Sequence, residues 1–279
     1  MSAHGPEGDV ALKIFSGDSS QEGIEHEIEL HRDLSGVSEY IVPFLGHGVA
    51  HPNNDSSVPS VRYIAMERAA RSLRQEIHVA GKLSAAETVD YVSKAAEGLD
   101  VLHRMRIVHR DVKTPNLLHG KTLWVADFGS ATTEGSETKG VITPSFAAPE
   151  LLRRKGKATV RSDVYSLGVV AAEALSGAPP FRRIEPRDYV RVVLSEDYPN
   201  LMKESTKGLP APMVAPVRKA MAQDPKDRYA SVGELAEALK KGLLEAQASA
   251  ARGGVVYDMR RPVNPQYMPR IKPTAAISR

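Results

Sequence analysis

The sequence contains no cysteine, so it offers no disulfide, no thiolate metal ligand and no cysteine nucleophile. It also lacks a long hydrophobic run. The most apolar stretch, residues 167–175, is interrupted by Glu173 and is far shorter than the roughly 20 residues that a membrane-spanning helix needs. Residues 1–9 show no basic segment followed by an apolar one, so we expect no export signal. We therefore predict a cytoplasmic protein without a membrane span.

A large excess of charge of one sign is absent as well. The 279 residues carry 37 Lys and Arg against 34 Asp and Glu, which gives a formal net charge of +3. A dedicated nucleic-acid-binding protein has a strongly basic face, so we expect no nucleic-acid partner. Charged residues make up 25% and hydrophobic residues 42% of the chain, a balance that allows a globular core of one or two compact units.

Short apolar runs and helical periodicity predict a strand-containing first part and a helical second part. In the first part we expect a helix at 22–34, a loop at 51–60, and strands at 10–15, 41–45 and 61–66. In the second part, Ser84 and Glu87 form a capping box, and helices are expected at 84–106, 162–176, 213–223 and 232–244. Beyond residue 253 the sequence turns rich in proline and basic residues, which indicates a mobile or surface-draped extension.

Two motifs in the second part indicate the chemistry. Residues 109–116 read H-R-D-V-K-T-P-N, and residues 127–129 read D-F-G directly after a strand-like run at 123–126. Together they supply a carboxylate, an ammonium group and an amide within six positions, and a second carboxylate eleven residues later. Phosphoryl transfer uses this set: one group for the acceptor hydroxyl, one for the transferred phosphate and two for Mg²⁺.

On these motifs the chain resembles the eukaryotic-type serine/threonine protein kinase family. The resemblance implies an α+β fold of two lobes. A truncated, small β-rich N-lobe would occupy residues 1–66, a larger α-helical C-lobe residues 67–250, and a basic, Pro-containing tail residues 251–279. It also implies an ATP-dependent enzyme that uses Mg²⁺ and transfers the γ-phosphate of ATP to Ser or Thr hydroxyls of protein substrates.

The resemblance gives each matching residue a role. Asp111 would accept the hydroxyl proton, and Lys113 would neutralise charge on the transferred phosphoryl group. Asn116 and Asp127 would hold the Mg²⁺ ions. Lys13, in V-A-L-K, would contact the α- and β-phosphates.

In the family, a helical glutamate pairs with the strand lysine. Glu27 shares a helical face with Ile24 and His31, whereas Glu29 lies on the polar side of the same helix. We therefore choose Glu27 as the partner of Lys13. The stretch from Lys13 to Glu27 is short for the family, which keeps Glu29 as the alternative.

The resemblance also favours Ser/Thr specificity and a protein substrate. Lys113 departs from the tyrosine-kinase pattern, and Thr143, in T-P-S-F-A-A-P-E, matches a threonine that touches the catalytic aspartate and lysine. A-P-E at 148–150 and D-P-K-D-R at 224–228 imply a structural ion pair. These features speak against a small-molecule phosphotransferase. The remaining structural residues implied by the resemblance are Glu150 and Arg228 for the ion pair, Asp163 for the cap of the catalytic-loop backbone, and His109 as a packed residue beneath that loop.

Adenine would lie between the lobes, in a pocket with apolar walls and a few backbone polar groups. From the register of the motifs, the walls would include Ala11 and Leu118. Backbone groups of Glu67 and Ala69 would make the hydrogen bonds to the base.

One feature departs from the family. The chain reaches Lys13 without room for two preceding strands or for the Gly-rich loop that covers ATP phosphates, which would leave the sheet with an exposed edge. Two functions therefore stay open: an active protein kinase, favoured by the full set of catalytic side chains, and a pseudokinase that acts as a protein-binding module.

The segment between Asp127 and Glu150 also suggests regulation. It holds four hydroxyl residues, and a phosphate on one of them would pair with Arg110. Glu134 or Glu137 would supply a permanent anion instead. The four hydroxyl residues are Thr132, Thr133, Ser136 and Thr138.

Overall fold

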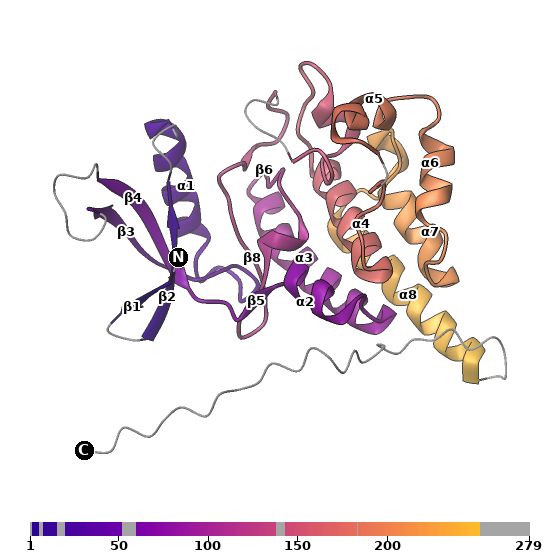
Figure 1. The fold of residues 1–279 in the computed structure, drawn as a ribbon, viewed down its shortest axis with the longest axis horizontal. Helices are drawn as coiled ribbons and strands as arrows, with labels where there is room; N and C mark the ends of the chain where they lie inside the picture. The colour runs from indigo at the N-terminus through magenta and orange to yellow at the C-terminus, as the bar shows by residue number, and fades with distance from the viewer. Residues whose placement is uncertain are drawn as a thin grey trace.

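A four-stranded antiparallel sheet and one helix form the first part of the chain (Figure 1). The computed structural model describes residues 2–5, 8–15, 20–51, 60–137, 143–182 and 184–251. The strands follow one another across the sheet in the order β1-β2-β4-β3. The elements of this lobe are β1 (Ser2–Gly5), β2 (Gly8–Ile14), α1 (Gln21–Leu34), β3 (Phe44–Ala50) and β4 (Val61–Glu67).

The sequence explains how α1 begins and what it packs against. The Ser20 side chain accepts a hydrogen bond from the Gly23 N–H at 3.2 Å and so caps the helix. Ile24 and Ile28 lie one turn apart on the buried face, and with Phe15 and Ile64 they form a small core of their own. The helix, β2 and β4 agree with the predicted ranges to within a few residues.

The expected strand at 41–45 is wrong. Residues Ile41 and Val42 precede β3, and they are 1% and 0% exposed. Ile41 forms an isolated bridge with Val125, and the Val42 N–H donates to the Val125 carbonyl at 3.1 Å. The run is apolar because it is buried against the second lobe, and the strand itself begins only at Phe44. Most of the loop expected at 51–60 lies outside the described residues.

The strand β1 was not predicted from the sequence. It pairs antiparallel with β2, in a register that runs from Ser2 opposite Ala11 to Gly5 opposite Gly8. One strand therefore precedes the strand of Lys13, where the sequence was expected to leave no room for two, and β1 takes the place of β2 at the edge of the sheet. The Gly5-Pro6 dipeptide is a turn signal that was available in the sequence.

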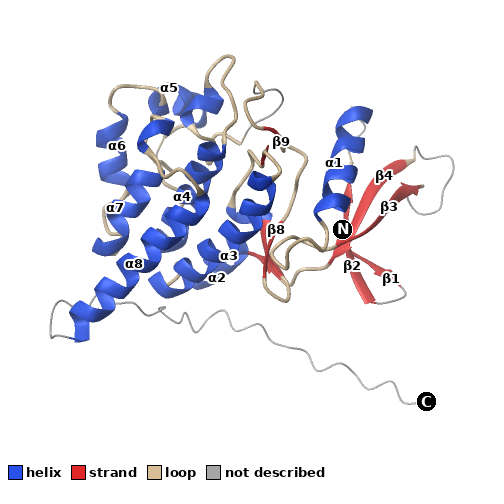
Figure 2. Ribbon diagram, turned by 180° about the vertical axis from the view of Figure 1, so that it is seen from behind, coloured by secondary structure: helices blue, strands red, loops and turns tan. Residues whose placement is uncertain are grey.

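The second lobe is mainly helical (Figure 2). Its four predicted helices are present, and the last one continues to Ala251, past its expected end at 244. The helices are α2 (Leu73–Ala80), α3 (Ala85–Arg104), α4 (Val160–Ser176), α5 (Tyr189–Val193), α6 (Tyr198–Ser205), α7 (Ala211–Ala220) and α8 (Val232–Ala251). The short strands and 3-10 turns are β5 (Arg71–Ser72), β6 (Ile107–Val108), η2 (Thr114–Asn116), β7 (Leu117–His119), β8 (Leu123–Val125), β9 (Thr132–Thr133), η3 (Pro149–Leu152), η4 (Pro186–Asp188) and η5 (Pro225–Asp227).

Helix α4 runs through the centre of this lobe and contacts α3, α7 and α8. Residues 162–175 are all buried, which is why the helix lacks a polar face. At its start the Thr159 N–H donates to the Ser162 hydroxyl at 3.1 Å, and the helix ends at Gly177, whose φ of 82° is left-handed. A β-carbon on Gly177 would lie 1.9 Å from the Gly81 carbonyl oxygen, so only glycine fits the close approach of α4 to the end of α2.

The buried residues form two hydrophobic clusters of unequal size. The larger one fills the helical lobe and extends into the first lobe through Leu34, Ile41 and Val42. The smaller one contains only the four residues named above for the first lobe. Among the described residues, no helix is both long and apolar enough to cross a membrane. The predicted extension beyond residue 253 lies outside the described residues.

Candidate active site

Asp111 lies at the centre of a group of polar side chains in the loop between β6 and η2. The Lys113 ammonium donates to one Asp111 carboxylate oxygen at 2.6 Å, and the Thr143 hydroxyl donates to the other at 3.0 Å. Lys113 also lies 3.1 Å from the Thr143 hydroxyl, and the Asn116 amide donates to the first Asp111 oxygen at 3.0 Å. The structure therefore brings together Asp111, Lys113, Asn116 and Thr143, to which the resemblance gave neighbouring roles in phosphoryl transfer.

Asp163, at the start of α4, holds the backbone of this loop in place. Its two carboxylate oxygens accept the N–H groups of His109 and Arg110, each at 2.9 Å, and the His103 ring lies at 2.8 Å. Burial would raise the pKa of Asp163, but the hydrogen bonds and charges of His103 and His109 outweigh it and hold the pKa below its usual value. Arg110 has a φ of 66°, so the chain turns sharply one residue before Asp111.

His109 is a packed residue beneath the loop, as the sequence suggested. It is 0% exposed, and its ring Nδ1 accepts the Asp111 N–H at 3.3 Å. Its Nε2 then carries the proton, which it donates to the Ala126 carbonyl at 3.3 Å. Both ring nitrogens are occupied with backbone groups, so His109 supports the backbone of the loop around Asp111.

Lys13 joins the two lobes. Its ammonium contacts the Glu27 carboxylate on α1 and lies 2.6 Å from an Asp127 carboxylate oxygen in the second lobe. The choice of Glu27 over Glu29 is thus confirmed for the pairing: Glu27 is 4% exposed, whereas Glu29 faces solvent. Burial would lower the pKa of Lys13, but the two carboxylates outweigh it and raise the pKa, so the ammonium stays charged.

The environment of Asp127 favours its ionised form. Burial would raise the pKa of Asp127, but the Lys13 ammonium outweighs it and lowers the pKa. Burial raises the pKa of Glu27, and Lys13 opposes that effect. Phe128 is 0% exposed and packs against the rings of His31 and His109.

Two features of the D-F-G segment concern the backbone. Asp127 has a φ of 70°, an uncommon conformation for a residue with a β-carbon. A β-carbon on Gly129 would lie 2.6 Å from a carboxylate oxygen of Glu27. A side chain at position 129 would therefore overlap the carboxylate of Glu27, the partner of Lys13.

The donor atoms at Asn116 and Asp127 fit a Mg²⁺ ion. The Asn116 amide nitrogen is directed to Asp111, which leaves the amide oxygen as a ligand, and Asp127 has a second carboxylate oxygen besides the one bonded to Lys13. The Asp127 side chain is 38% exposed. Mg²⁺ is usually held by one or two carboxylates together with phosphate oxygens and water, and these two residues meet that requirement.

The residues proposed for adenine lie where the two lobes meet. Ala11 on β2 is opposite Met66 on β4, and the chain after β4 reaches β7 through a hydrogen bond from the Ala70 N–H to the His119 carbonyl at 2.7 Å. Ala69 and Leu118 both pack against the large core cluster. The N–H of Glu67 donates to the Pro43 carbonyl. Of the two backbone groups of Glu67, the carbonyl is therefore the candidate to accept a hydrogen bond from adenine.

The expected ion pair behind the segment at 148–150 is present. Arg228 is 3% exposed, and its guanidinium donates to the two carboxylate oxygens of Glu150 at 2.9 and 2.7 Å. Sequence reasoning missed two further contacts. The Ser162 hydroxyl donates to Glu150 at 2.8 Å, and the Tyr189 hydroxyl donates to the Ser145 carbonyl at 3.1 Å.

The segment after D-F-G is bonded to Arg106. Glu134 pairs with Arg106 at 3.3 Å, and its N–H donates to the Arg106 carbonyl at 2.8 Å. Glu137 forms a bridge with Lys157, opposite it in the fold. Thr138, one of the four predicted hydroxyl residues, lies outside the described residues.

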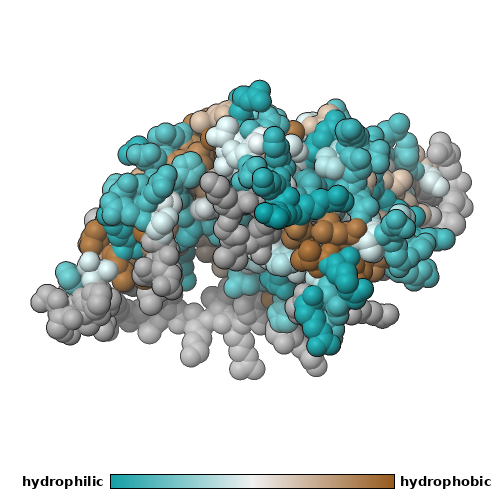
Figure 3. All heavy atoms as spheres, turned by 90° about the horizontal axis from the view of Figure 1, so that it is seen from above, coloured by the Kyte–Doolittle hydropathy of each residue, from teal (hydrophilic) through white to brown (hydrophobic). Residues whose placement is uncertain are grey.

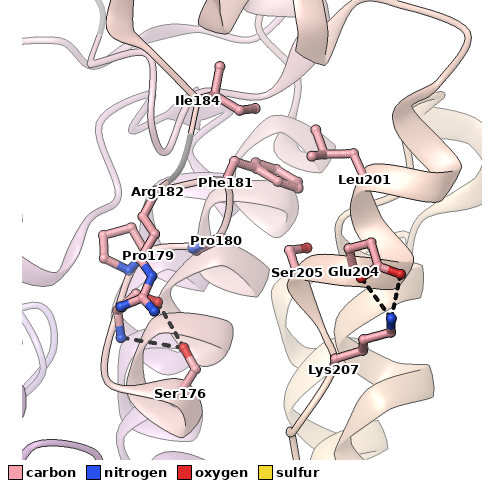
Figure 4. Close-up of a pocket in the computed structure, with 11 residues that line it drawn as sticks. Ser176, Pro179, Pro180, Phe181, Arg182, Ile184, Leu201, Glu204, Ser205 and Lys207 are labelled. Atoms are coloured by element: carbon pink, nitrogen blue, oxygen red, sulfur yellow. Dashed lines mark hydrogen bonds and ion pairs between the residues drawn. The ribbon is translucent and has the colours of Figure 1, made fainter.

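A cavity of about 450 Å³ opens elsewhere in the helical lobe, between the end of α4 and α6 (Figure 4). Figure 4 shows Phe181 and Leu201 on opposite sides of it, with Lys207 directed to Glu204. None of its lining residues belongs to the predicted site.

Comparison with known proteins gives consistent matches. Residues 4–241 match the protein kinase domain family. The chain is 30% identical over 236 residues to the serine/threonine-protein kinase PknB of Mycobacterium leprae, which covers 81% of this chain and 38% of that protein. It is 34% identical over 244 residues to the serine/threonine-protein kinase PknK of Mycobacterium tuberculosis, which covers 83% of this chain and 21% of that protein. The chain thus spans only part of the length of these relatives.

Proposed function

The chain belongs to the protein kinase domain family, and on this premise we propose that it transfers the γ-phosphate of ATP to Ser or Thr hydroxyls of a protein substrate. The observation that carries the proposal is the group around Asp111, in which Lys113, Asn116 and Thr143 all hold the same carboxylate. The cytoplasmic location expected from the sequence is part of this proposal.

The reaction requires a new bond between the acceptor oxygen and the γ-phosphorus, while the bond from that phosphorus to the β–γ bridging oxygen breaks. The Asp111 carboxylate orients the hydroxyl and accepts its proton, and Lys113 and Thr143 fix the rotamer of that carboxylate. Lys113 also places a positive charge where negative charge develops. Mg²⁺, when bound, neutralises phosphate charge.

Lys13 takes part in the proposal as an orienting cation. Glu27 holds the ammonium from the first lobe while Asp127 holds it from the second, so the side chain is preorganised at the junction of the lobes. Asn116 and Asp127 would hold Mg²⁺ through the oxygens that remain available to them. Ala11, Leu118 and Ala69 would form the walls around adenine, with backbone groups of Glu67 and Ala69 as its hydrogen-bond partners.

Two measurements test this function. The purified chain is incubated with radiolabelled ATP, Mg²⁺ and a generic Ser/Thr protein substrate, and transfer of label to Ser or Thr is expected. In parallel, Mg²⁺-ATP at 100 times its dissociation constant should raise the stability of the fold by about 2.7 kcal/mol, visible as a thermal shift. Asp127→Asn should weaken the metal-dependent part of that shift. A chain that transfers no label and shows no shift at millimolar Mg²⁺-ATP would contradict the proposal.

A further inference from the structure

The turn between η3 and α4 has an unusual composition. Residues 153–157 read R-R-K-G-K, and the four cationic side chains, Arg153, Arg154, Lys155 and Lys157, are all exposed. Residues 151–159 contain no Asp or Glu. In a chain with a net charge of +3, this is a strong local concentration of positive charge.

The turn is a built structure. The Gly156 N–H donates to the Arg153 carbonyl at 3.0 Å, which closes the turn, and Lys155 adopts a left-handed φ of 58°. A β-carbon on Gly156 would lie 1.8 Å from the Glu150 carbonyl oxygen, so the turn packs directly on η3. A lysine held in this conformation persists only where its surroundings fix it.

The residues that follow the turn tie it to the segment after D-F-G. The Ala158 N–H donates to the Ser136 carbonyl at 3.0 Å, and the Gly135 N–H donates to the Ala158 carbonyl at 2.8 Å. Lys157 lies opposite Glu137. The backbone that carries the four cations is therefore held in two ways. It packs on η3 at Glu150, and it is hydrogen-bonded through Ala158 to the segment after D-F-G.

Several carboxylates of the neighbouring elements are already engaged in ion pairs. Glu150 binds Arg228, Glu134 binds Arg106, and Asp188 beside α5 binds Arg191. The backbone of Glu137 forms a β-bridge with that of Lys157. Among the described residues, none of the turn's four cations forms an ion pair within 4.0 Å.

The position of the turn suits a substrate contact. The turn directly follows η3, and η3 contacts α5. Figure 3, which views the molecule from the end at which Figure 1 labels α5, shows mostly hydrophilic residues around one hydrophobic group on the helical lobe. The turn follows the segment that runs from Thr143, at the catalytic aspartate, to Glu150.

We propose that the turn 153–157 is a docking element for an acidic segment of the protein substrate, so that the preferred substrates carry a run of Asp or Glu outside the accepting Ser or Thr. The proposal rests on the kinase function above and names its substrate class. Arg153, Arg154 and Lys155 supply unmatched charge, and the pinned backbone presents them without the entropy cost of ordering a mobile loop. Carboxylate side chains match this chemistry, and the guanidinium groups can bind them with two hydrogen bonds each.

Binding is measured first, because it does not require catalysis. The full chain is titrated into a fluorescent peptide that carries a run of Glu, and into a counterpart with Gln in the same places, and anisotropy is recorded at about 0.05 M and about 0.5 M NaCl. At low salt the Glu peptide should bind about ten-fold more tightly, which corresponds to roughly 1.4 kcal/mol. At high salt the difference should largely disappear, because exposed charges are screened.

A triple variant locates the site, and a matched control removes the same charge elsewhere. The test variant replaces three cations of the turn by glutamine: Arg153→Gln, Arg154→Gln and Lys155→Gln. The control replaces three exposed lysines of α6 and α8: Lys203→Gln, Lys240→Gln and Lys241→Gln. The preference for the Glu peptide should be lost in the first and kept in the second. A thermal melt of each variant establishes that it is folded. If the triple variant does not fold, the double variant Arg153→Gln with Arg154→Gln replaces it in the binding measurement.

Kinetics then link the turn to the proposed reaction. Two Ser/Thr peptides share one acceptor sequence, and a flexible linker joins it to either the Glu run or the Gln run. The wild-type kcat/KM should be about ten-fold higher for the Glu peptide, mainly through KM, and the triple variant should phosphorylate both at the rate of the Gln peptide.

Several results would overturn the inference. These are equal affinity for the two peptides, a preference that survives in the triple variant, and preferential binding of the turn to RNA or to anionic vesicles over the Glu peptide. A chain that phosphorylates neither peptide would contradict the proposed function, and the anisotropy measurements would still decide whether the turn binds acidic peptides.

Discussion

At the scale of single residues, the candidate site is organised around two carboxylates with different environments. Asp111 is held by an ammonium, a hydroxyl and an amide, all within hydrogen-bond distance. Asp127 is bound to Lys13 through one carboxylate oxygen and retains the other. The first arrangement suits a group that receives a proton, and the second suits a metal ligand.

Asp111→Asn should lower kcat by a factor of at least about 100, because general-base assistance contributes roughly 10²–10⁴ to a reaction rate. The amide is nearly isosteric but cannot accept the hydroxyl proton. The thermal shift with Mg²⁺-ATP should remain, since Asp111 is expected to orient the acceptor and not the nucleotide. Steady-state kinetics and thermal melts on the same preparations measure both effects.

The matched control is Thr143→Ser, which keeps a hydroxyl beside Asp111 and should retain most activity. Equal kcat for Asp111→Asn and the parent chain would refute the role of Asp111.

His31 predicts a specific pH dependence of stability. It is 2% exposed, its Nε2 donates to the Val42 carbonyl at 2.9 Å, and burial lowers its pKa. Above about pH 6.5 the ring is neutral in both the folded and the unfolded chain. Below that pH the unfolded chain binds a proton that the folded chain excludes, so stability falls until the pH passes below the folded pKa.

The variant His31→Gln can still donate to the Val42 carbonyl but does not titrate. Between pH 7.5 and pH 5.5 the wild type should lose up to about 1.4 kcal/mol more stability than the variant. Urea denaturation at a series of pH values measures this difference, and the other histidines cancel because both proteins contain them. Parallel stability profiles for the two proteins would show that His31 is not kept neutral by the fold.

At the scale of secondary-structure elements, glycines set how closely helices approach one another. Gly81 and Gly177 end α2 and α4 with positive φ values of 78° and 82°, but their ψ values differ, at −45° and 1°. A β-carbon on Gly81 meets nothing within 4 Å, whereas one on Gly177 meets the Gly81 carbonyl. Substitution of Gly81 therefore tests backbone strain alone, whereas substitution of Gly177 adds steric overlap to it.

Gly81→Ala should cost roughly 1–3 kcal/mol, the strain of a β-carbon in a sparsely populated backbone conformation. Gly177→Ala should cost roughly 1–2 kcal/mol for its left-handed conformation and about 1–3 kcal/mol more, because the chain must move to relieve the overlap. Equilibrium urea unfolding of the two single variants measures the difference. If both variants lose the same stability, the close approach of α4 to the end of α2 is not a constraint.

The elements also show what the sequence could predict. The pairing of Lys13 with Glu27 was predictable because a helical face follows from spacing alone, and the catalytic loop was predictable because its residues are close in sequence. The strand expected at 41–45 failed because an apolar run does not reveal whether it lies in a sheet or between lobes. Contacts such as Tyr189 with Ser145 depend on how distant elements pack, and the sequence carries no local signal for them.

At the scale of the whole molecule, backbone hydrogen bonds and an ion pair join the two lobes near the candidate site. The Val125 N–H donates to the Tyr40 carbonyl at 2.8 Å, and the Val42 N–H donates to the Val125 carbonyl. Lys13 adds an ion pair that crosses between them. The distance between Asp127 and Lys13 therefore depends on the relative position of the two lobes. The proposed nucleotide site depends on the same relative position.

The unequal size of the two hydrophobic clusters has a consequence for amide hydrogen exchange. The four-residue cluster under β2 and β4 buries far less apolar surface than the cluster around α4, so the sheet of the first lobe should open locally at a lower free energy than the helical lobe. Backbone amides of β2 and β4 should exchange with deuterium before those of α4, and Mg²⁺-ATP should slow the first group most. Uniform exchange across both lobes would mean that the chain opens only as a single unit.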